Sequence, residues 1–377
     1  MVTRITNGKV LIGDCFLETD LYFEGKTIVK IGGAMPFDRN IDAQGHYVTA
    51  GFIDIHCHGG GGADFTDGDP EGVRIAVLTH LRHGTTTLFP TLLSADTVVL
   101  ERALDAIEET GKNLPSLGGI HLEGPYFSPV QSGAQNGAAL RSPAPEEYLP
   151  VLKKHKIARW DYAPEMDKDN MFLKALLSAG VLPAAAHTDA TCDQMEAAAS
   201  SGCRLITHLY SCTSTIRREK GYRIPGVTEA AYLCDGIDAE LIADGCHLPD
   251  SLLRLAYKLK GADRLALVTD AMRAAGTDTQ GACNIGGVSC IIEDGVAKLP
   301  DRSAFAGSIA TADRLVRTAV NAGIPLTDCV KMITQTPARI MGLSCKGVLR
   351  GGFDADIVIF DRDIQVKTVI VQGELVV

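Results

Sequence analysis

The sequence predicts an α/β fold: a parallel sheet surrounded by helices, joined to a smaller β region. Two patterns predict it. Between residues 51 and 344, short β-branched runs alternate with helical stretches, whereas both chain ends consist of short alternating segments separated by glycine-containing turns. The chain has 377 residues, 46% of them hydrophobic and 22% charged, which is typical of a globular protein. Its length suits two to three domains, or one large barrel with an appendage.

The N-terminal segment is predicted to form four strands, over residues 4–12, 16–25, 27–33 and 46–51. Asn7-Gly8 and Glu24-Gly25 have the composition of hairpin turns. The C-terminal segment repeats the alternating pattern over residues 355–361 and 365–377. We therefore expect residues 1–50 and 345–377 to pair into one small β-sandwich domain formed by both chain ends.

The central part contains eight β-branched runs, at residues 51–58, 85–90, 118–124, 158–165, 181–187, 203–209, 239–245 and 264–270. Helical stretches lie between most of them, and a further one follows the eighth run, as in residues 71–84, 169–180 and 311–323. Eight parallel strands with outer helices close a TIM-type (β/α)8 barrel, which we assign to residues 51–344.

An insertion and an alternative fold complete this prediction. Residues near 281–300 should form a strand pair inserted after the eighth barrel strand. An open, doubly wound sheet is the alternative. The glycine-rich stretch at 59–64 follows a strand, but it lacks the G-x-G-x-x-G spacing and the immediate helix of that fold.

Charge and cysteine content exclude several classes of partner. A net charge of −10 makes the chain a poor general binder of nucleic acid or anionic membranes. No apolar run approaches the roughly 20 residues of a membrane helix, and the N-terminus has no secretory h-region. The 11 cysteines contain no C-x-x-C pair. We expect a cytoplasmic protein without nucleic-acid or membrane partners.

Polar residues gather at the carboxyl ends of the predicted strands, where barrels build active sites. These residues are His56, His58, His121, Glu123, His187, His208 and Asp270, with His247 just beyond the seventh strand. A single such histidine is most simply a packed core residue. Many imidazoles and carboxylates on one rim are costly without a cation, so together they favour a divalent metal site.

The residue types suggest how a metal is held. Glu123, His187 and His208 form the smallest set that leaves a position for water. His56 and His58 point to one side of their strand and would supply much of a second site, with a carboxylate shared between the ions. Neutral imidazole and carboxylate suit Zn²⁺ or a similar transition ion. Asp270 is then a natural general base, the alternative being that it N-caps a following turn.

Motifs along nearly the whole chain carry a family resemblance. They include AGFIDIHCHGGGG, HLEGPYFSP, GAQN, AHTDAT, THLYS, IADGCH, VTDAM and FAGS. In these motifs the chain resembles the N-acetylglucosamine-6-phosphate deacetylases of the metal-dependent amidohydrolase superfamily. The resemblance implies hydrolysis of N-acetyl-D-glucosamine 6-phosphate to D-glucosamine 6-phosphate and acetate in amino-sugar catabolism, by a homodimer. It also implies one or two ions of Zn²⁺, with Fe²⁺, Mn²⁺ or Co²⁺ as alternatives.

The resemblance also assigns roles to individual residues. Glu123, His187 and His208 match the ligands of single-metal members, and His56 and His58 match the additional pair of two-metal members. Asp270 matches the catalytic acid–base, and Arg223 and His247 match the phosphate site. The substrate pocket is matched by Gln135, Ser211 and Cys212. Gly307 and Ser308 precede a helix and either bring their backbone to the substrate or form a turn and cap.

Two departures from the family pattern bear on substrate recognition. Gln135 stands where many relatives have a histidine that hydrogen-bonds the carbonyl under attack; its amide can donate but carries no charge. Carbonyl polarisation would then depend more on metal, which favours the two-metal arrangement. Ser211 and Cys212 replace a frequent Asn-Ala pair, so the fit of the hexosamine epimer and its phosphate stays open.

Three alternative functions have different sequence requirements. A deacetylase for N-acetylgalactosamine 6-phosphate or another N-acyl amino sugar would need only a different pocket. A dihydroorotase- or hydantoinase-like enzyme would need a carboxylated lysine on the fourth strand, and residues 158–165 contain no lysine. A catalytically inactive barrel scaffold usually loses ligands or the base, whereas Glu123, His187, His208 and Asp270 are all present.

Overall fold

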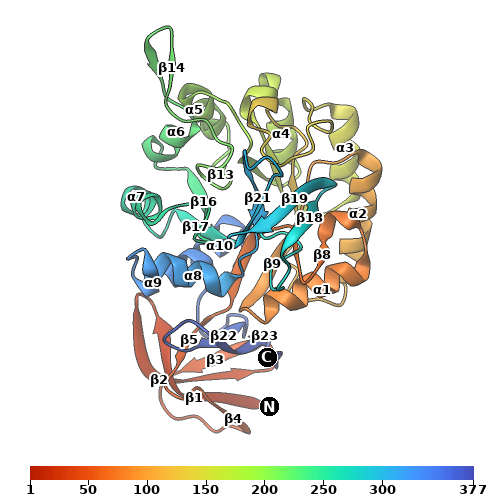
Figure 1. The fold of residues 1–377 in the computed structure, drawn as a ribbon. Helices are drawn as coiled ribbons and strands as arrows, with labels where there is room; N and C mark the ends of the chain where they lie inside the picture. Colours follow the sequence, from red (N-terminus) through yellow and green to blue (C-terminus); the bar gives the residue numbers. More distant parts are fainter.

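The computed structural model covers residues 1–377 and places a barrel above a β region built from both chain ends (Figure 1). Eight parallel strands form the barrel: β6 (Phe52–Cys57), β9 (Thr85–Leu92), β10 (Ile120–Glu123), β11 (Ile157–Tyr162), β12 (Leu182–Ala185), β13 (Leu205–Ile206), β16 (Asp238–Ile242) and β17 (Leu265–Val268). Each lies within or overlaps one of the eight predicted runs, so the predicted strand number is confirmed.

The barrel closes between its last and first strands. The Asp270 N–H, just after β17, donates to the His56 carbonyl at 2.9 Å, and Ala271 pairs with Cys57 in a parallel bridge. This closure excludes the open, doubly wound sheet. It also brings the end of the eighth strand against the two histidines that end the first, because closure removes the edges that would otherwise separate them.

Helices cover the outside of the barrel: α1 (Pro70–Leu81), α2 (Thr97–Gly111), α3 (Pro145–Lys154), α4 (Met171–Ser178), α5 (Cys192–Ser200), α6 (Val227–Leu233), α7 (Asp250–Lys260), α8 (Ala312–Asn321), α9 (Leu326–Ile333) and α10 (Gln335–Ile340). The three helices expected from sequence correspond to α1, α4 and α8. Local chemistry sets the start of α1, where Asp69 accepts from the backbone N–H groups of Glu71 and Gly72 and Pro70 occupies the first turn. None of the helices combines the length and apolar character that a bilayer crossing requires.

The β region is one mixed eight-stranded sheet from both chain ends: β1 (Val2–Ile12), β2 (Cys15–Glu24), β3 (Thr27–Ile31), β4 (Arg39–Asp42), β5 (Tyr47–Ala50), β22 (Ile357–Phe360), β23 (Val366–Val371) and β24 (Glu374–Leu375). The sheet curls over a shared apolar core that includes Ile5 and Ile370. Its β3 side meets the segment before β22, where the Ile28 N–H donates to the Phe353 carbonyl at 2.8 Å. The pairing of the two ends is confirmed, while the boundaries at residues 50 and 345 stay a prediction.

One of the two predicted hairpin turns is wrong. Glu24 pairs with Thr27, so the chain does turn after Glu24. Asn7-Gly8 lies inside β1, where the register with β2 shifts and Asn7 has φ 55°. A bulge with one left-handed residue favours the same Asn-Gly pair as a tight turn, which explains the error.

The insertion after β17 is larger than predicted. It is a four-stranded antiparallel sheet of β18 (Gly281–Ile285), β19 (Val288–Glu293), β20 (Val296–Lys298) and β21 (Phe305–Ser308). The Ser308 N–H donates to the Asp270 carbonyl at 2.9 Å, which ties this sheet to the barrel rim. Two small hairpins complete the fold: β7 (Gly59–Gly60) with β8 (Ala63–Asp64), and β14 (Arg217–Glu219) with β15 (Tyr222–Ile224). The second projects from the barrel (Figure 1).

Candidate metal centre and active-site pocket

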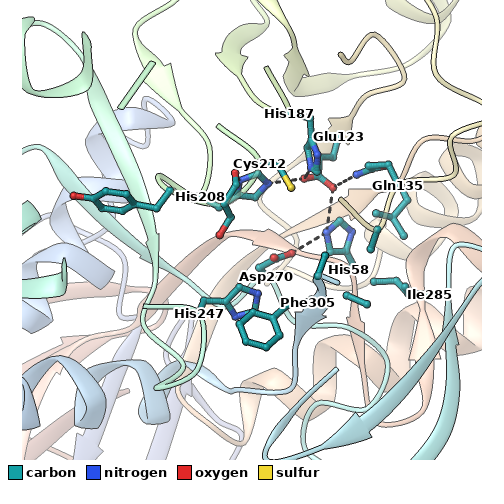
Figure 2. A pocket seen from close by; sticks show the side chains of 17 residues that line it. His58, Glu123, Gln135, His187, His208, Cys212, His247, Asp270, Ile285 and Phe305 are labelled. Atoms are coloured by element: carbon teal, nitrogen blue, oxygen red, sulfur yellow. Dashed lines mark hydrogen bonds and ion pairs between the residues drawn. The ribbon is translucent and has the colours of Figure 1, made fainter. Parts of the chain in front are cut away.

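One pocket opens at the carboxyl ends of the barrel strands and collects most of the predicted site residues (Figure 2). Those lining it are His58, Glu123, Gln135, His187, His208, Ser211, Cys212, His247, Asp270 and Gly307. They come from strand ends far apart in sequence, and the inserted sheet adds Ile285 and Phe305 to the wall. The structure therefore brings together side chains that are dispersed in the sequence between residues 58 and 307.

Glu123, at the end of β10, lies at the centre of the site. Its Oε1 is 3.1 Å from His187 Nε2 and 3.0 Å from His208 Nε2. The same oxygen is 3.6 Å from His56 Nε2, and Oε2 is 3.4 Å from His58 Nε2. These residues form two groups of potential ligands. One consists of Glu123, His187 and His208, the other of Glu123, His56 and His58, so the two groups share the Glu123 carboxylate.

The outer nitrogens of all four imidazoles face hydrogen-bond acceptors. Three face backbone carbonyls: His58 Nδ1 is 3.2 Å from the Thr91 oxygen, His187 Nδ1 2.8 Å from that of Gln131, and His208 Nδ1 3.0 Å from that of Ser211. The fourth, His56 Nδ1, is 3.2 Å from Glu240 Oε2. A carbonyl or carboxylate can only accept, so each Nδ1 carries its proton. When the ring is neutral, its Nε2 lone pair therefore points inward.

These donors fit a divalent cation. Several inward lone pairs and carboxylate oxygens lie within 4.8 Å of one another, an arrangement that repels itself without positive charge. Burial would raise the pKa of Glu123, but His56, His187 and His208 outweigh it and hold that pKa well below its usual value. Burial opposes protonation of His58, yet Asp270 and Glu123 raise its pKa to about 9. The centre thus attracts positive charge, which a metal ion can supply in place of protons.

Asp270 follows β17 and faces the second group of donors. Its Oδ1 lies 3.1 Å from His58 Nε2 and 3.5 Å from His56 Nε2. Burial opposes ionisation, but the hydrogen bond from His58 and the charges of both histidines lower the pKa of Asp270 below its usual range. A carboxylate that borders both the ligand cluster and the open pocket can accept a proton from a water held there.

Backbone strain marks the same residues. His187, His208 and Asp270 each follow a barrel strand in a left-handed conformation, with φ of 44°, 30° and 46°. Non-glycine residues rarely adopt this region, and such strain concentrates at functional sites. In each case the unusual turn aims a side chain into the barrel mouth.

Gln135 contacts the centre through Glu123. Its Nε2 donates to Glu123 Oε2 at 2.6 Å, and its Oε1 accepts from the Ser94 N–H at 3.0 Å. The backbone donor fixes the orientation of the amide, so the amino group must face the carboxylate. Gln135 therefore orients Glu123 with one of the two N–H groups of its amide.

His247 lies on the opposite wall from Gln135 (Figure 2). Its Nδ1 is 2.8 Å from Asp244 Oδ2, and its ring packs against Phe305 with centroids 4.8 Å apart. Asp244 also accepts from the His247 backbone N–H at 2.8 Å. These contacts hold the ring at the edge of the pocket, where its other nitrogen can meet a polar substrate group.

Three predicted site residues do not line the pocket. His56 is fully buried behind His58, consistent with a ligand position but not with substrate contact. Ser308 is also buried, and its Oγ accepts from the Ala310 N–H at 2.8 Å, so its side chain shapes the turn before α8. Arg223 lies exposed on β15 and donates to the Gly221 carbonyl at 3.2 Å; the structure does not bring it to the pocket of its own chain.

Sequence reasoning missed a buried charged network beneath the site. Arg159 and Asp161 on β11 and Glu240 on β16 are fully buried. The Arg159 Nε donates to Asp161 Oδ1 at 2.8 Å, and its Nη1 donates to Glu240. The sequence did contain a signal for this network: Arg159 and Asp161 are charged residues two positions apart in an otherwise apolar strand. Side chains two positions apart lie on the same face of a strand, which here is the inside of the barrel. His121 joins this network through Asp161, at 2.9 Å.

Comparison with known proteins agrees with the site. Residues 47–376 match the model of the Amidohydrolase family. The chain is 33% identical over 344 residues to the N-acetylglucosamine-6-phosphate deacetylase of Lysinibacillus sphaericus, covering 89% of this chain and 87% of the relative. It is 32% identical over 334 residues to the N-acetylgalactosamine-6-phosphate deacetylase of Shewanella sp. (strain ANA-3), covering 87% and 82%.

A solved structure resembles the fold over its whole length. It is a mutant N-acetyl-D-glucosamine-6-phosphate deacetylase from Mycobacterium smegmatis in complex with N-acetyl-D-glucosamine-6-phosphate. The TM-score is 0.91 at 33% identity, and the alignment covers 100% of this chain and 99% of that one.

The shared carboxylate leads to a prediction about ion content. We expect two divalent ions per chain in the wild type, one in His187→Ala and none in Glu123→Ala, because Glu123 belongs to both groups of donors. Elemental analysis of purified protein after removal of loosely bound metal measures this. His83→Ala, which removes a partly exposed partner of Asp313 that belongs to neither group of donors, serves as control and should keep both ions. Two ions retained in Glu123→Ala would contradict the arrangement.

Proposed function

This chain belongs to the amidohydrolase family, and we propose that it is an enzyme that hydrolyses the acetamido group of N-acetyl-D-glucosamine 6-phosphate. The products are D-glucosamine 6-phosphate and acetate. The observation that carries the proposal is the convergence of Glu123, four imidazoles and Asp270 at the mouth of one barrel. An amide is unreactive and its leaving amine needs a proton, so the site must combine water activation with proton delivery.

The donor set would hold one or two divalent ions, and we propose Zn²⁺, with Fe²⁺, Mn²⁺ and Co²⁺ as alternatives. Histidine nitrogen and carboxylate oxygen suit these ions. When bound, such an ion lowers the pKa of water and polarises a carbonyl oxygen. Glu123, His187 and His208 would hold one ion, and His56 and His58, with Glu123 shared, would hold the other.

Asp270 would carry the proton through the reaction. As a carboxylate it accepts a proton from the attacking water while the water oxygen forms a bond to the carbonyl carbon. It then returns that proton to the nitrogen as the C–N bond breaks, leaving the free amine and acetic acid, which loses its proton to solvent to give acetate.

Gln135 would act through Glu123 in this scheme. With its oxygen held by the Ser94 N–H, it holds Glu123 Oε2 in place, and because the amide carries no charge, carbonyl polarisation would fall mainly to the metal centre. This explains how glutamine can occupy a position where many relatives have histidine, and it favours the two-ion arrangement.

We propose that the sugar phosphate extends from the metal centre toward Ser211, Cys212 and His247. All three residues line the same pocket, and His247 lies on the far side of Asp270 from Gln135 (Figure 2). The ring of His247 is held by Asp244, so its free nitrogen is a defined donor when the ring is protonated. Gly307 would contribute its backbone to the same wall.

We further propose a homodimer in which the β14–β15 hairpin of one copy reaches the pocket of the other. Exposed apolar side chains on and beside this hairpin support an intersubunit contact: Ile216 is 57% and Tyr222 is 76% exposed. Arg223 lies on the same hairpin, where its guanidinium would meet the phosphate of the neighbouring site. All eleven cysteines are free, which suits the reducing cytoplasm where we place the enzyme.

A deacetylase for N-acetylgalactosamine 6-phosphate is the second candidate. The 32% identity to a relative of that name supports it. Ser211 and Cys212, in place of a frequent Asn-Ala pair, are compatible with either epimer. The metal chemistry is common to both candidates. Only the epimeric hydroxyl differs, so relative kcat/KM values for the two sugar phosphates decide between them.

Removing the proton carrier should abolish turnover without removing metal. We expect Asp270→Asn to fold and to keep its ions, yet to lose roughly 10²–10⁴-fold in kcat, the usual contribution of general acid–base catalysis. Acetate release and ion content measure the two effects. Turnover like that of the wild type would refute the assignment of Asp270.

Removing the substrate phosphate should reduce kcat/KM by at least about 100-fold, since each charged hydrogen bond is worth about 1.5–3 kcal/mol. Comparing N-acetyl-D-glucosamine with its 6-phosphate measures this loss. Arg223→Ala and His247→Asn should each shrink the preference for the phosphorylated sugar. Arg218→Ala, which changes another arginine on the same hairpin, should leave it intact. Equal kcat/KM for both sugars would remove the phosphate site from the proposal.

A further inference from the structure

Glu240 connects the buried charged network to the metal centre. Its side chain is fully buried on β16, and its Oε2 lies 3.2 Å from His56 Nδ1 and accepts from the His208 backbone N–H at 3.3 Å. Its Oε1 accepts from Arg159 Nη1. Glu240 touches neither the pocket nor the reacting atoms, so any role in the reaction must pass through His56.

We propose that Glu240, oriented by Arg159, is a positioning residue that selects the Nδ1-protonated tautomer of His56 and thereby forms the second metal position. That position consists of His56, His58 and Glu123. The inference rests on the metal-dependent function proposed above. It adds a group that governs one of the two ions and leaves the other unaffected.

The four imidazoles differ in a way that isolates this role. His58, His187 and His208 are held by backbone carbonyls, which no side-chain substitution removes. Only His56 depends on a side chain for its tautomer. Changing Glu240 therefore acts mainly on the second position. The ring nitrogens of His187 and His208 keep their own partners, and the contact of Glu240 with the first group is confined to the backbone N–H of His208.

Arg159 fixes the orientation of the Glu240 carboxylate. All five N–H donors of its guanidinium meet acceptors: Asp161 receives two at 2.8 and 3.0 Å, Thr207 Oγ1 one at 2.7 Å, the Ile55 carbonyl one at 3.3 Å, and Glu240 the last. The arginine is fully buried, so no water can replace a lost partner without rearrangement. The group at position 240 must therefore present an acceptor to Arg159.

This requirement makes the substitution Glu240→Gln a specific test of how the tautomer of His56 is set. An amide has one accepting and one donating end. Arg159 takes the oxygen, so the amino group faces His56 Nδ1. A donor there moves the ring proton to Nε2, and a protonated Nε2 cannot bind a metal ion. The isosteric change Glu240→Gln should thus disable His56 while preserving the volume of the core.

The test is ion content and affinity, measured by elemental analysis and by competition with a chromophoric chelator loaded with Zn²⁺. We expect two ions in the wild type and one in Glu240→Gln, with affinity for the second ion weakened by about 10–100-fold, the usual effect of losing a group that orients a ligand. His56→Ala should match Glu240→Gln. Asp238→Asn, on the same strand but paired with Arg264 and Arg339, is the matched control and should keep two ions.

A rescue separates tautomer control from general damage. In Arg159→Met/Glu240→Gln the competing donor is gone, so the amide oxygen can turn to His56 Nδ1 and the second ion should return. If Glu240→Gln does not fold, which circular dichroism reveals, the double variant carries the test, and one ion there would overturn the inference. Two tightly bound ions in folded Glu240→Gln, a single ion in the wild type, or loss of both ions together would also overturn it. A wild type that binds no ion would instead refute the proposed function.

Discussion

The site depends on one buried carboxylate that is shared between two pairs of imidazoles. Glu123 is almost completely inaccessible, and either of its oxygens alone could satisfy only part of the histidine cluster. Burying it would be costly if it stood alone, because a charge in a low-dielectric interior needs a partner. The inward nitrogens supply no positive charge unless they are protonated or metal-bound. The buried Glu123 carboxylate can therefore be neutralised either by protonated histidines or by bound cations, and the state with bound cations is the one that supports catalysis.

The barrel makes this concentration of charge possible. Its closure joins the end of β17 to the end of β6, which places Asp270 beside His58 although 211 positions separate them in the chain. The inserted sheet reinforces the joint through the Ser308 N–H and the Asp270 carbonyl. Rigid strands thus position the reactive groups, and the strained residues at their ends aim them.

Sequence reasoning succeeded where a local rule carried the information. The alternation of His56 and His58 predicts a shared direction from period two alone, and the strand-end rule places Asp270 on the same rim. The projecting position of Arg223 could not be predicted, since it depends on how a hairpin leaves the barrel. The role of Ser308 could not be predicted either, because a serine before a helix has the same sequence pattern whether its hydroxyl contacts a substrate or a backbone N–H.

The buried network shows why the interior of the barrel was the hardest part to predict. Arg159 on β11 and Glu240 on β16 are far apart in sequence, and each alone contradicts the rule that charges stay at the surface. Their pairing removes the contradiction, but only the closed barrel brings them together. An ion pair of this kind is weak evidence for stability, because a well-packed apolar pair can be equally stable. Its contact with a ligand histidine gives a better reason for its presence: the pair fixes where the proton of His56 lies, and hence where a cation can bind.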